Sequence, residues 1–136
     1  MSYAKQMLDT YPRDFNLDAD QLAGAIEAVY GCAQACTACA DACLSEDRVA
    51  ELIKCIQLNL NCADVCVTAG RSLSRQTEYD ASLTRALLEA CAQTCRSCAE
   101  ECERHAEMGM EHCRVCAEAC RRCEQACQGL IDAIVA

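Results

Sequence analysis

Apolar residues and cysteines recur every three or four positions along most of this chain, which is the spacing of one face of an α-helix. Four long stretches keep this rhythm, and polar segments separate them. Residues that favour helix N-termini precede three of the stretches: Asn16 or Asp18, Ser45 and Asp47, and Thr77 or Asp80. The pattern predicts helices over roughly 18–44 and 47–72, from Thr77 or Asp80 to near His105, and from Gly109 to about Ile134.

A short amphipathic piece precedes these helices at residues 2–10 and ends before Pro12. Two of the three connections between the long helices are short, and short connections make neighbouring helices antiparallel. We therefore expect an all-α fold, an antiparallel up-down-up-down four-helix bundle at 17–136 with a short N-terminal helical arm at 1–16. Segments 32–66 and 91–127 repeat each other weakly, so the bundle looks like a doubled helical hairpin.

The cysteines follow the same three-and-four rhythm on every long helix. A row with this spacing occupies one helix face, and in a bundle that face is the core seam. Alanines flank many of the cysteines, which lets helix axes approach and sulfur atoms of different helices meet. The sequence therefore predicts a core lined by all 16 cysteines: Cys32, Cys36, Cys39, Cys43, Cys55, Cys62, Cys66, Cys91, Cys95, Cys98, Cys102, Cys113, Cys116, Cys120, Cys123 and Cys127.

Apolar side chains extend the same faces at one end of the bundle. In an antiparallel arrangement they gather away from the 44–47 and 106–110 turns, and the cysteines fill the other part of the core. We expect an apolar plug next to a sulfur-lined tube, the plug being made by Leu22, Ile26, Val29, Leu73, Leu83, Leu87, Leu88, Leu130, Ile131 and Ile134.

Composition and charge restrict the function further. The chain has 136 residues and a formal net charge of −9, which argues against binding to nucleic acid phosphates. The N-terminal segment has no basic start followed by an apolar stretch, and no apolar run approaches the roughly 20 residues that span a bilayer. We therefore expect a cytoplasmic protein. The cytosol keeps thiols reduced, so dense cysteines there indicate metal binding more than disulfides.

Soft thiolate ligands select copper(I), zinc or iron–sulfur clusters. Zinc needs closed sets of four ligands, usually on turns, and continuous rows offer no division into fours. The Cys-Pro ending of common iron–sulfur patterns is missing. Copper(I) accepts few ligands, and thiolates can bridge two ions. The rows therefore favour multiple copper(I) ions per chain, on the order of one per cysteine.

Two histidines and two methionines cluster around the last turn. They are His105, Met108, Met110 and His112, and the topology places them at the mouth of the tube, opposite the plug. Imidazole and thioether both bind copper(I), so we expect these four residues to capture copper and pass it inward. Asn59 occupies a slot where the rhythm of the second long helix would place a cysteine, and its role stays open.

The four rows CAQACTACADAC, CIQLNLNCADVC, CAQTCRSCAEEC and CRVCAEACRRCEQAC, without an export signal, resemble the cytosolic branch of the bacterial copper storage proteins. The resemblance covers nearly the whole chain. It implies a four-helix bundle, many copper(I) ions held inside by thiolates, entry at an end that carries His or Met, and association of four copies into a tetramer. Asn59 departs from a uniform row.

Three other interpretations remain at this stage. The chain could buffer zinc or cadmium, it could form disulfides reversibly, or its thiols could only pack. Sulfur atoms along one helix face seldom meet disulfide geometry, which disfavours the second interpretation. We find no nucleophile–base pair and no phosphate-binding loop, so we expect no enzyme, no nucleic acid partner and no membrane partner.

Overall fold

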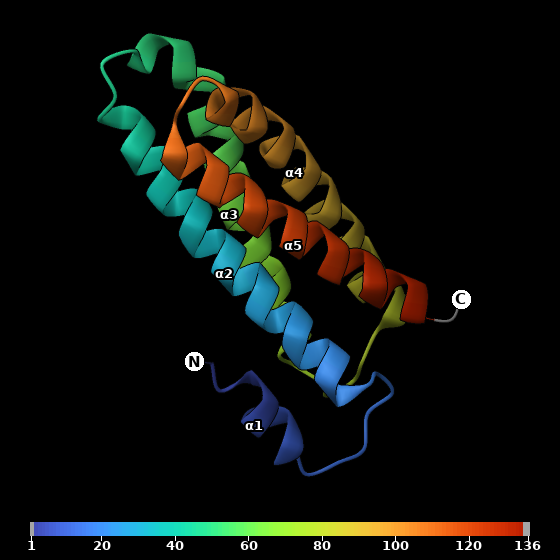
Figure 1. Cartoon of the computed structure of the whole chain (residues 1–136). Helices are drawn as coiled ribbons and strands as arrows, with labels where there is room; N and C mark the ends of the chain where they lie inside the picture. Colours follow the sequence, from blue (N-terminus) through green and yellow to red (C-terminus); the bar gives the residue numbers. More distant parts are fainter. Residues whose placement is uncertain (1, 135–136) are drawn as a thin grey trace.

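The computed structural model describes residues 2–134, and Figure 1 shows helices throughout this range. Met1, Val135 and Ala136, at the ends of the predicted arm and bundle, lie outside the described residues. The elements are α1 (Ala4–Asp9), α2 (Ala19–Leu44), a 3-10 helix η1 (Val49–Leu52), α3 (Ile53–Leu73), α4 (Ala81–Glu107) and α5 (Glu111–Ala133). The predicted all-α bundle is confirmed.

Two of the predicted N-caps form the expected hydrogen bonds. The carboxylate of Asp18 accepts a hydrogen bond from the backbone N–H of Gln21 at 2.9 Å, and Asp80 accepts one from Leu83 at 3.0 Å. Each carboxylate satisfies a backbone donor that has no partner in the first helical turn. Gly109, with φ +93°, makes the turn between α4 and α5.

The predicted start of the second long helix was wrong. Ser45 is the C-cap of α2, and the chain then turns into η1 before α3 begins at Ile53. The N-cap of α3 is Leu52, which has no side chain that can accept a hydrogen bond. Leu52 is fully buried, so the 3-10 turn carries this side chain into the core before the α-helix begins.

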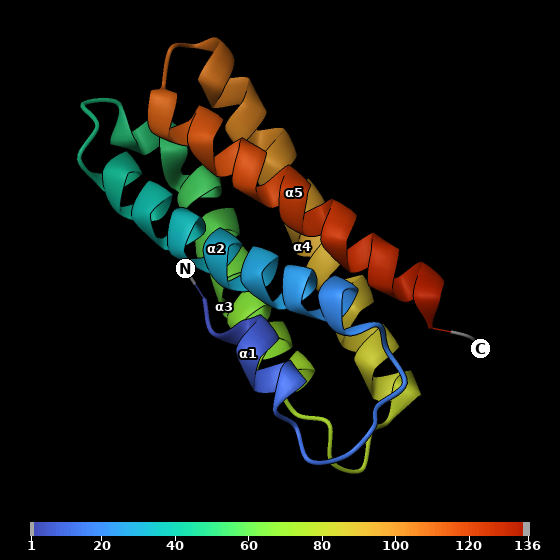
Figure 2. The same cartoon turned by 60° about the horizontal axis from the view of Figure 1, so that its bottom comes forward.

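The four long helices form a closed ring of neighbours, with α2 against α3, α3 against α4, α4 against α5 and α5 against α2. Neighbouring helices run in opposite directions in both views (Figures 1 and 2). All four seams therefore face one central axis, and the α2–α3 and α4–α5 turns meet at the same end of the bundle.

An apolar plug closes the other end, as the sequence predicted in outline. Leu22, Leu88 and Leu130 are fully buried there, and Leu73 and Ile131 are nearly so. Leu83 was wrongly included, because it is 54% exposed. The next residue, Thr84, is buried instead, because it lies four residues before Leu88 and seven before Cys91 on the buried face of α4.

The N-terminal arm lies beside α2 near the plug (Figure 2). Leu8 is buried against the bundle, and the Tyr11 hydroxyl contacts the Thr77 hydroxyl at 2.9 Å. Met7 remains exposed. Within residues 2–134, no helix is both long enough and apolar enough to cross a membrane.

Candidate metal centre

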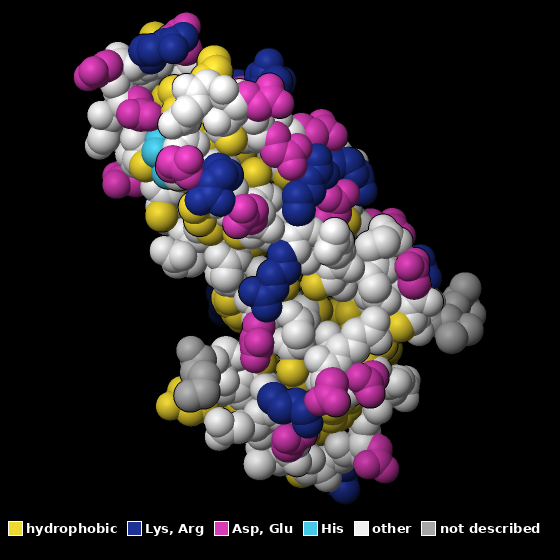
Figure 3. Space-filling view, in the orientation of Figure 1, with side chains coloured by type: hydrophobic (Ala, Val, Ile, Leu, Met, Phe, Trp, Pro, Cys, Tyr) yellow, Lys and Arg dark blue, Asp and Glu magenta, His cyan; other side chains and the backbone are white. Residues whose placement is uncertain are grey.

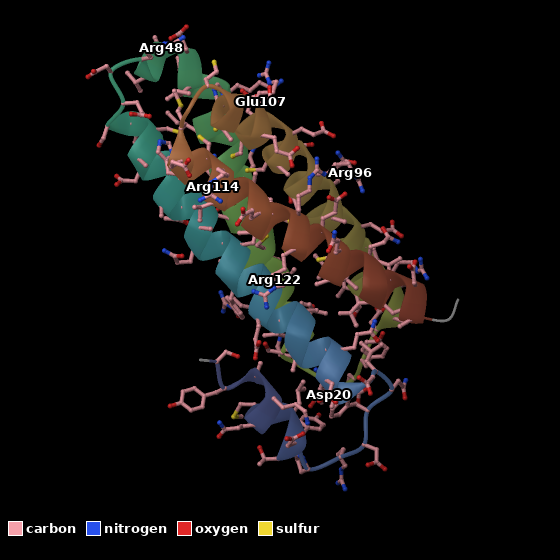
Figure 4. All side chains as sticks on the ribbon, viewed as in Figure 1. Asp20, Arg48, Arg96, Glu107, Arg114 and Arg122 are labelled. Carbon is pink, nitrogen blue, oxygen red and sulfur yellow. The ribbon has the colours of Figure 1, made fainter. Side chains whose placement is uncertain are left out.

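Cysteine side chains line most of the core beyond the plug. All 16 cysteines are free thiols, and every one of them is at most 2% exposed. They come from all four long helices, as the rows predicted, and Figure 4 shows yellow sulfur atoms between the ribbons. Burial of this many thiols is compatible with a folded apo protein, since a neutral thiol packs like a small apolar group.

The sulfur atoms of different helices lie close to one another. Cys32 on α2 lies 3.8 Å from Cys62 on α3, 4.0 Å from Cys95 on α4 and 3.7 Å from Cys120 on α5. Cys36 approaches Cys120 to 3.6 Å. A disulfide holds its sulfurs at about 2.05 Å, so these are separate thiols. Two sulfurs bound to one metal ion at about 2.3 Å each lie at most about 4.6 Å apart, so the spacing suits bridging by metal.

Several overlapping sets of four ligand atoms follow from this spacing. In each set the four ligand atoms lie within 4.8 Å of one another. The set Cys32–Cys36–Cys62–Cys120 shares cysteines with the sets on either side of it, so the middle of the row is a continuous lattice, whereas the set that contains His112 shares no cysteine with the others named here. Among the sets are Cys66–Cys91–Cys95–Cys123, Cys32–Cys62–Cys66–Cys95, Cys36–Cys98–Cys116–Cys120 and Cys39–Cys43–His112–Cys113.

The thiols influence one another's protonation. Burial raises the pKa of Cys43 to about 12. The neighbouring thiol of Cys116, followed by other thiols and burial, raises the pKa of Cys36, whereas hydrogen bonds from Cys120 and other neighbours lower that of Cys62. Cys127, at the plug end, also has a raised pKa because Cys123 and Cys91 lie beside it. A proton on such a thiol can be exchanged for copper(I), which leaves the net charge unchanged.

Asn59 is fully buried inside this sulfur row. Its amide nitrogen donates to the Cys55 carbonyl oxygen at 2.8 Å and also contacts the sulfurs of Cys55 and Cys102 at 3.4 and 3.7 Å. Its amide oxygen accepts from the thiols of Cys98 at 3.3 Å and Cys116 at 2.9 Å. The amide therefore satisfies its own polar atoms and links cysteines of three helices where a thiol is missing.

His112 lies directly against the sulfur row at the turn end. Its Nδ1 atom is 3.5 Å from the sulfur of Cys39 and 3.6 Å from that of Cys113. Its Nε2–H donates to a carboxylate oxygen of Glu46 at 3.3 Å. The side chain is 28% exposed, so it connects solvent with the buried thiols. Imidazole atoms are visible in cyan at this end of the surface (Figure 3).

His105 is placed differently from His112. It is 4% exposed, its Nε2–H donates to Glu101 at 3.0 Å, and its Nδ1 atom has no hydrogen-bond partner within residues 2–134. Glu101 is also buried and pairs with Arg104 through its other oxygen. Burial opposes ionisation of Glu101, but the hydrogen bonds from Arg104 and His105 outweigh it, so the pKa of Glu101 lies below its usual value.

The two methionines flank the α4–α5 turn. Met108 is 52% exposed, whereas Met110 is half-buried and packs against the core. Together with His105, Arg48 and Glu107, they line a surface hollow of about 590 Å³. Arg48 and Glu107 mark this end of the bundle in Figure 4. The four predicted mouth residues thus share one end, with His112 on the sulfur row and the other three around the hollow.

A family model described as "Copper storage protein" matches residues 18–132. The chain belongs to the copper storage protein family. A Streptomyces lividans copper storage protein, Ccsp, loaded with 10 copper equivalents has a TM-score of 0.93 to this chain and is 57% identical, over 96% of this chain and 98% of that one. Another structure, of copper loading with five coppers to a cytosolic copper storage protein from the same organism, is 61% identical, with a TM-score of 0.81 over 83% and 93% of the two chains.

A curated relative, the uncharacterized cysteine-rich protein YhjQ of Bacillus subtilis, is 33% identical over 72 residues. The match covers 53% of this chain and 63% of that protein, so the chain spans just under two thirds of the relative's length. The model of the copper storage protein family includes all 16 cysteines of this chain, since the rows run from Cys32 to Cys127 within residues 18–132.

Two residues that contact the histidines were not predicted from the sequence as part of the site. Glu101 and Glu46 each accept a hydrogen bond from a mouth histidine. Glu101 stands three residues after Cys98 and four before His105, so the three-and-four rhythm itself places it beside the seam. Glu46 is 66 residues from His112 in the sequence, and no pattern links the two.

Proposed function

We propose that this protein stores copper(I) reversibly and at high capacity on the thiolates of its core. The observation that carries this proposal is the spacing of the sulfurs, at 3.6 to 4.0 Å across all four helices. Soft thiolates select copper(I) over the hard cations of the cytosol. If each copper ion is bound by two thiolates and each thiolate bridges two copper ions, the 16 cysteines hold about one copper each.

The mouth residues have a separate role in the proposal. His112 contacts both solvent and the first thiols, so it is suited to take copper(I) from a donor and pass it to Cys39 and Cys113. His105, Met108 and Met110 surround the neighbouring hollow and offer further soft ligands. Copper enters at this end because the plug closes the other one with fully buried leucines.

An anaerobic titration of the fully reduced protein tests storage. Copper(I) is added in steps while bound metal and helicity by circular dichroism are measured, and zinc is titrated in parallel. We expect a helical apo protein that binds about one copper per thiol and little zinc. Saturation at a few copper ions would contradict storage. A protein that is unfolded until zinc is added would indicate structural zinc sites.

The mouth is tested by replacing His105, His112, Met108 and Met110 with leucine. We expect the final copper content to stay the same, because the thiols remain, and the rates of loading from a chelator and of removal by a chelator to fall. Unchanged rates would refute an entrance at this end. In this function the protein binds and releases metal without catalysing a reaction, and we place it in the cytoplasm, as in the S. lividans relative described as cytosolic.

We propose further that four copies associate through the outer face of α2 and α3. Five large apolar side chains are exposed there: Tyr30, Leu44, Ile53, Leu60 and Val67. Helix α2 has no Lys or Arg, whereas the outer surfaces of α4 and α5 carry ion pairs such as Arg121–Glu103 and Arg96–Glu124. Interface centres are poor in charge and rich in apolar groups, which favours the α2–α3 face.

A further inference from the structure

Both mouth histidines use the same ring nitrogen to contact a carboxylate. The Nε2 atom of His105 lies 3.0 Å from Glu101, and that of His112 lies 3.3 Å from Glu46. In both residues the second ring nitrogen, Nδ1, takes no part in the contact with the carboxylate and can therefore bind a different group. In His112 it points at the sulfurs of Cys39 and Cys113, and in His105 it is buried without a partner within residues 2–134.

A neutral imidazole carries one N–H group and one lone pair, and the two ring nitrogens divide these roles. A carboxylate only accepts hydrogen bonds, so the nitrogen that faces it must carry the proton. Glu101 and Glu46 thereby leave the lone pair on Nδ1. A buried acceptor without a donor is unfavourable, so the orphaned Nδ1 of His105 indicates a site that a cation completes.

Glu101 is itself held in a fixed orientation. It is 5% exposed, it lies one helical turn before His105, and Arg104 pairs with the carboxylate oxygen that does not contact the histidine. Carboxylates that orient metal-binding histidines in this way fix both the tautomer and the ring. The Glu46–His112 pair is more exposed, at 35% and 28% for the two side chains, so its constraint is weaker.

We propose that Glu101 and Glu46 are positioning residues that hold His105 and His112 in the Nε2–H tautomer, so that the Nδ1 lone pairs accept copper(I) at the mouth. Glu101 acts through His105 and binds no copper itself. The inference rests on the proposed storage function, because it describes how copper enters the same sulfur row.

The test uses the substitution Glu101→Gln. Arg104 donates to one oxygen of Glu101, so in the variant it retains the amide oxygen at that position and turns the amide NH₂ toward His105. The amide then donates to Nε2, and the proton of His105 must move to Nδ1. Long-range ¹H–¹⁵N NMR spectra of the apo protein report the tautomer directly. We expect the Nε2–H form in the wild type and the Nδ1–H form in Glu101→Gln.

Loading kinetics connect the tautomer to copper. We expect the initial rate of copper(I) transfer from a chelator to fall about ten-fold or more in Glu101→Gln, because loss of such partners typically costs 10- to 100-fold. The double variant Glu101→Gln/Arg104→Ala frees the amide to rotate, so we expect it to regain the Nε2–H tautomer and most of the rate. Total copper content should be the same in every variant.

Glu107→Gln is the matched control, since it removes the same charge from the same helix at the mouth without touching a histidine. Equal slowing in both variants would mean that charge attracts the ion, and it would overturn the positioning role. An unchanged tautomer in Glu101→Gln would overturn it too. A wild-type protein that fails to bind about one copper per thiol would instead refute storage, so the two failures can be distinguished.

Discussion

Replacing Asn59 with alanine isolates the contribution of the buried amide to the apo bundle. The amide lies among thiols of α3, α4 and α5 and is fully buried. Alanine keeps the helix intact and removes every polar contact of the side chain at once. The thiols around the site stay in place, so the substitution separates the stability of the apo core from its ability to bind copper.

The geometry sets the size of the effect. The hydrogen bond from the Asn59 amide to the Cys55 carbonyl oxygen, at 2.8 Å, contributes about 0.5–1.5 kcal/mol. The four contacts with the sulfurs of Cys55, Cys98, Cys102 and Cys116 each add less, because a thiol is a weak donor and a weak acceptor. The cavity left by the amide adds a further cost. We expect Asn59→Ala to lower the free energy of unfolding of the apo protein by about 2–4 kcal/mol.

Anaerobic urea denaturation of the reduced apo protein, followed by circular dichroism, measures this loss. Asn61→Ala is the control, because Asn61 is an exposed asparagine on the same helix and should change stability by at most about 0.5 kcal/mol. Copper content should be unchanged in both variants. If Asn59→Ala cost no more than Asn61→Ala, the hydrogen bonds of Asn59 would contribute nothing net, and the amide would only fill space.

Three other predictions concern the plug, the outer face and the thiols. Leu88→Ala should destabilise the apo protein by about 2–5 kcal/mol in urea denaturation, because Leu88 is fully buried, yet leave copper content unchanged; a parallel loss of copper would show that plug and tube are not independent. Leu60→Glu should reduce the mass of the assembly measured by light scattering, because it places a charge in the proposed α2–α3 interface, whereas Val115→Glu on α5 should leave that mass unchanged. The opposite result would indicate that the copies associate through α5 instead. Copper(I) loading at pH 7 should release protons into weak buffer, since the pKa of Cys43 is about 12 and its thiol is protonated before copper binds; uptake without proton release would contradict this protonation state.

The helices could be predicted from the sequence because short-range rules determine them. Asp18 and Asp80 cap α2 and α4 through contacts three residues away, and the cysteine rows mark the buried faces. The predicted helix start was wrong where tertiary packing overrides those short-range rules. The second long helix begins later than Ser45 and Asp47 suggested, because burial of Leu52 draws the chain into a 3-10 turn first. A cap residue shows where a helix can begin, whereas the core determines where it does begin.

The mouth shows why the proposed ligand residues were easier to predict than the carboxylates that contact them. Cysteine and histidine indicate metal binding by their residue type alone. Glutamates are common on exposed helix faces, and residue type does not distinguish Glu101 from Glu100 or Glu103. Only Glu101 among them is buried beside His105, because α4 turns that position toward the seam that Cys98 and His105 share. The three-and-four spacing along α4 therefore predicts a buried position for Glu101 as well as for the cysteines. Glu46 depends on the closure of the whole bundle, since it reaches His112 from the turn after a different helix. Rows on single helices can be predicted from local periodicity, but a contact between two turns requires the three-dimensional arrangement of the helices.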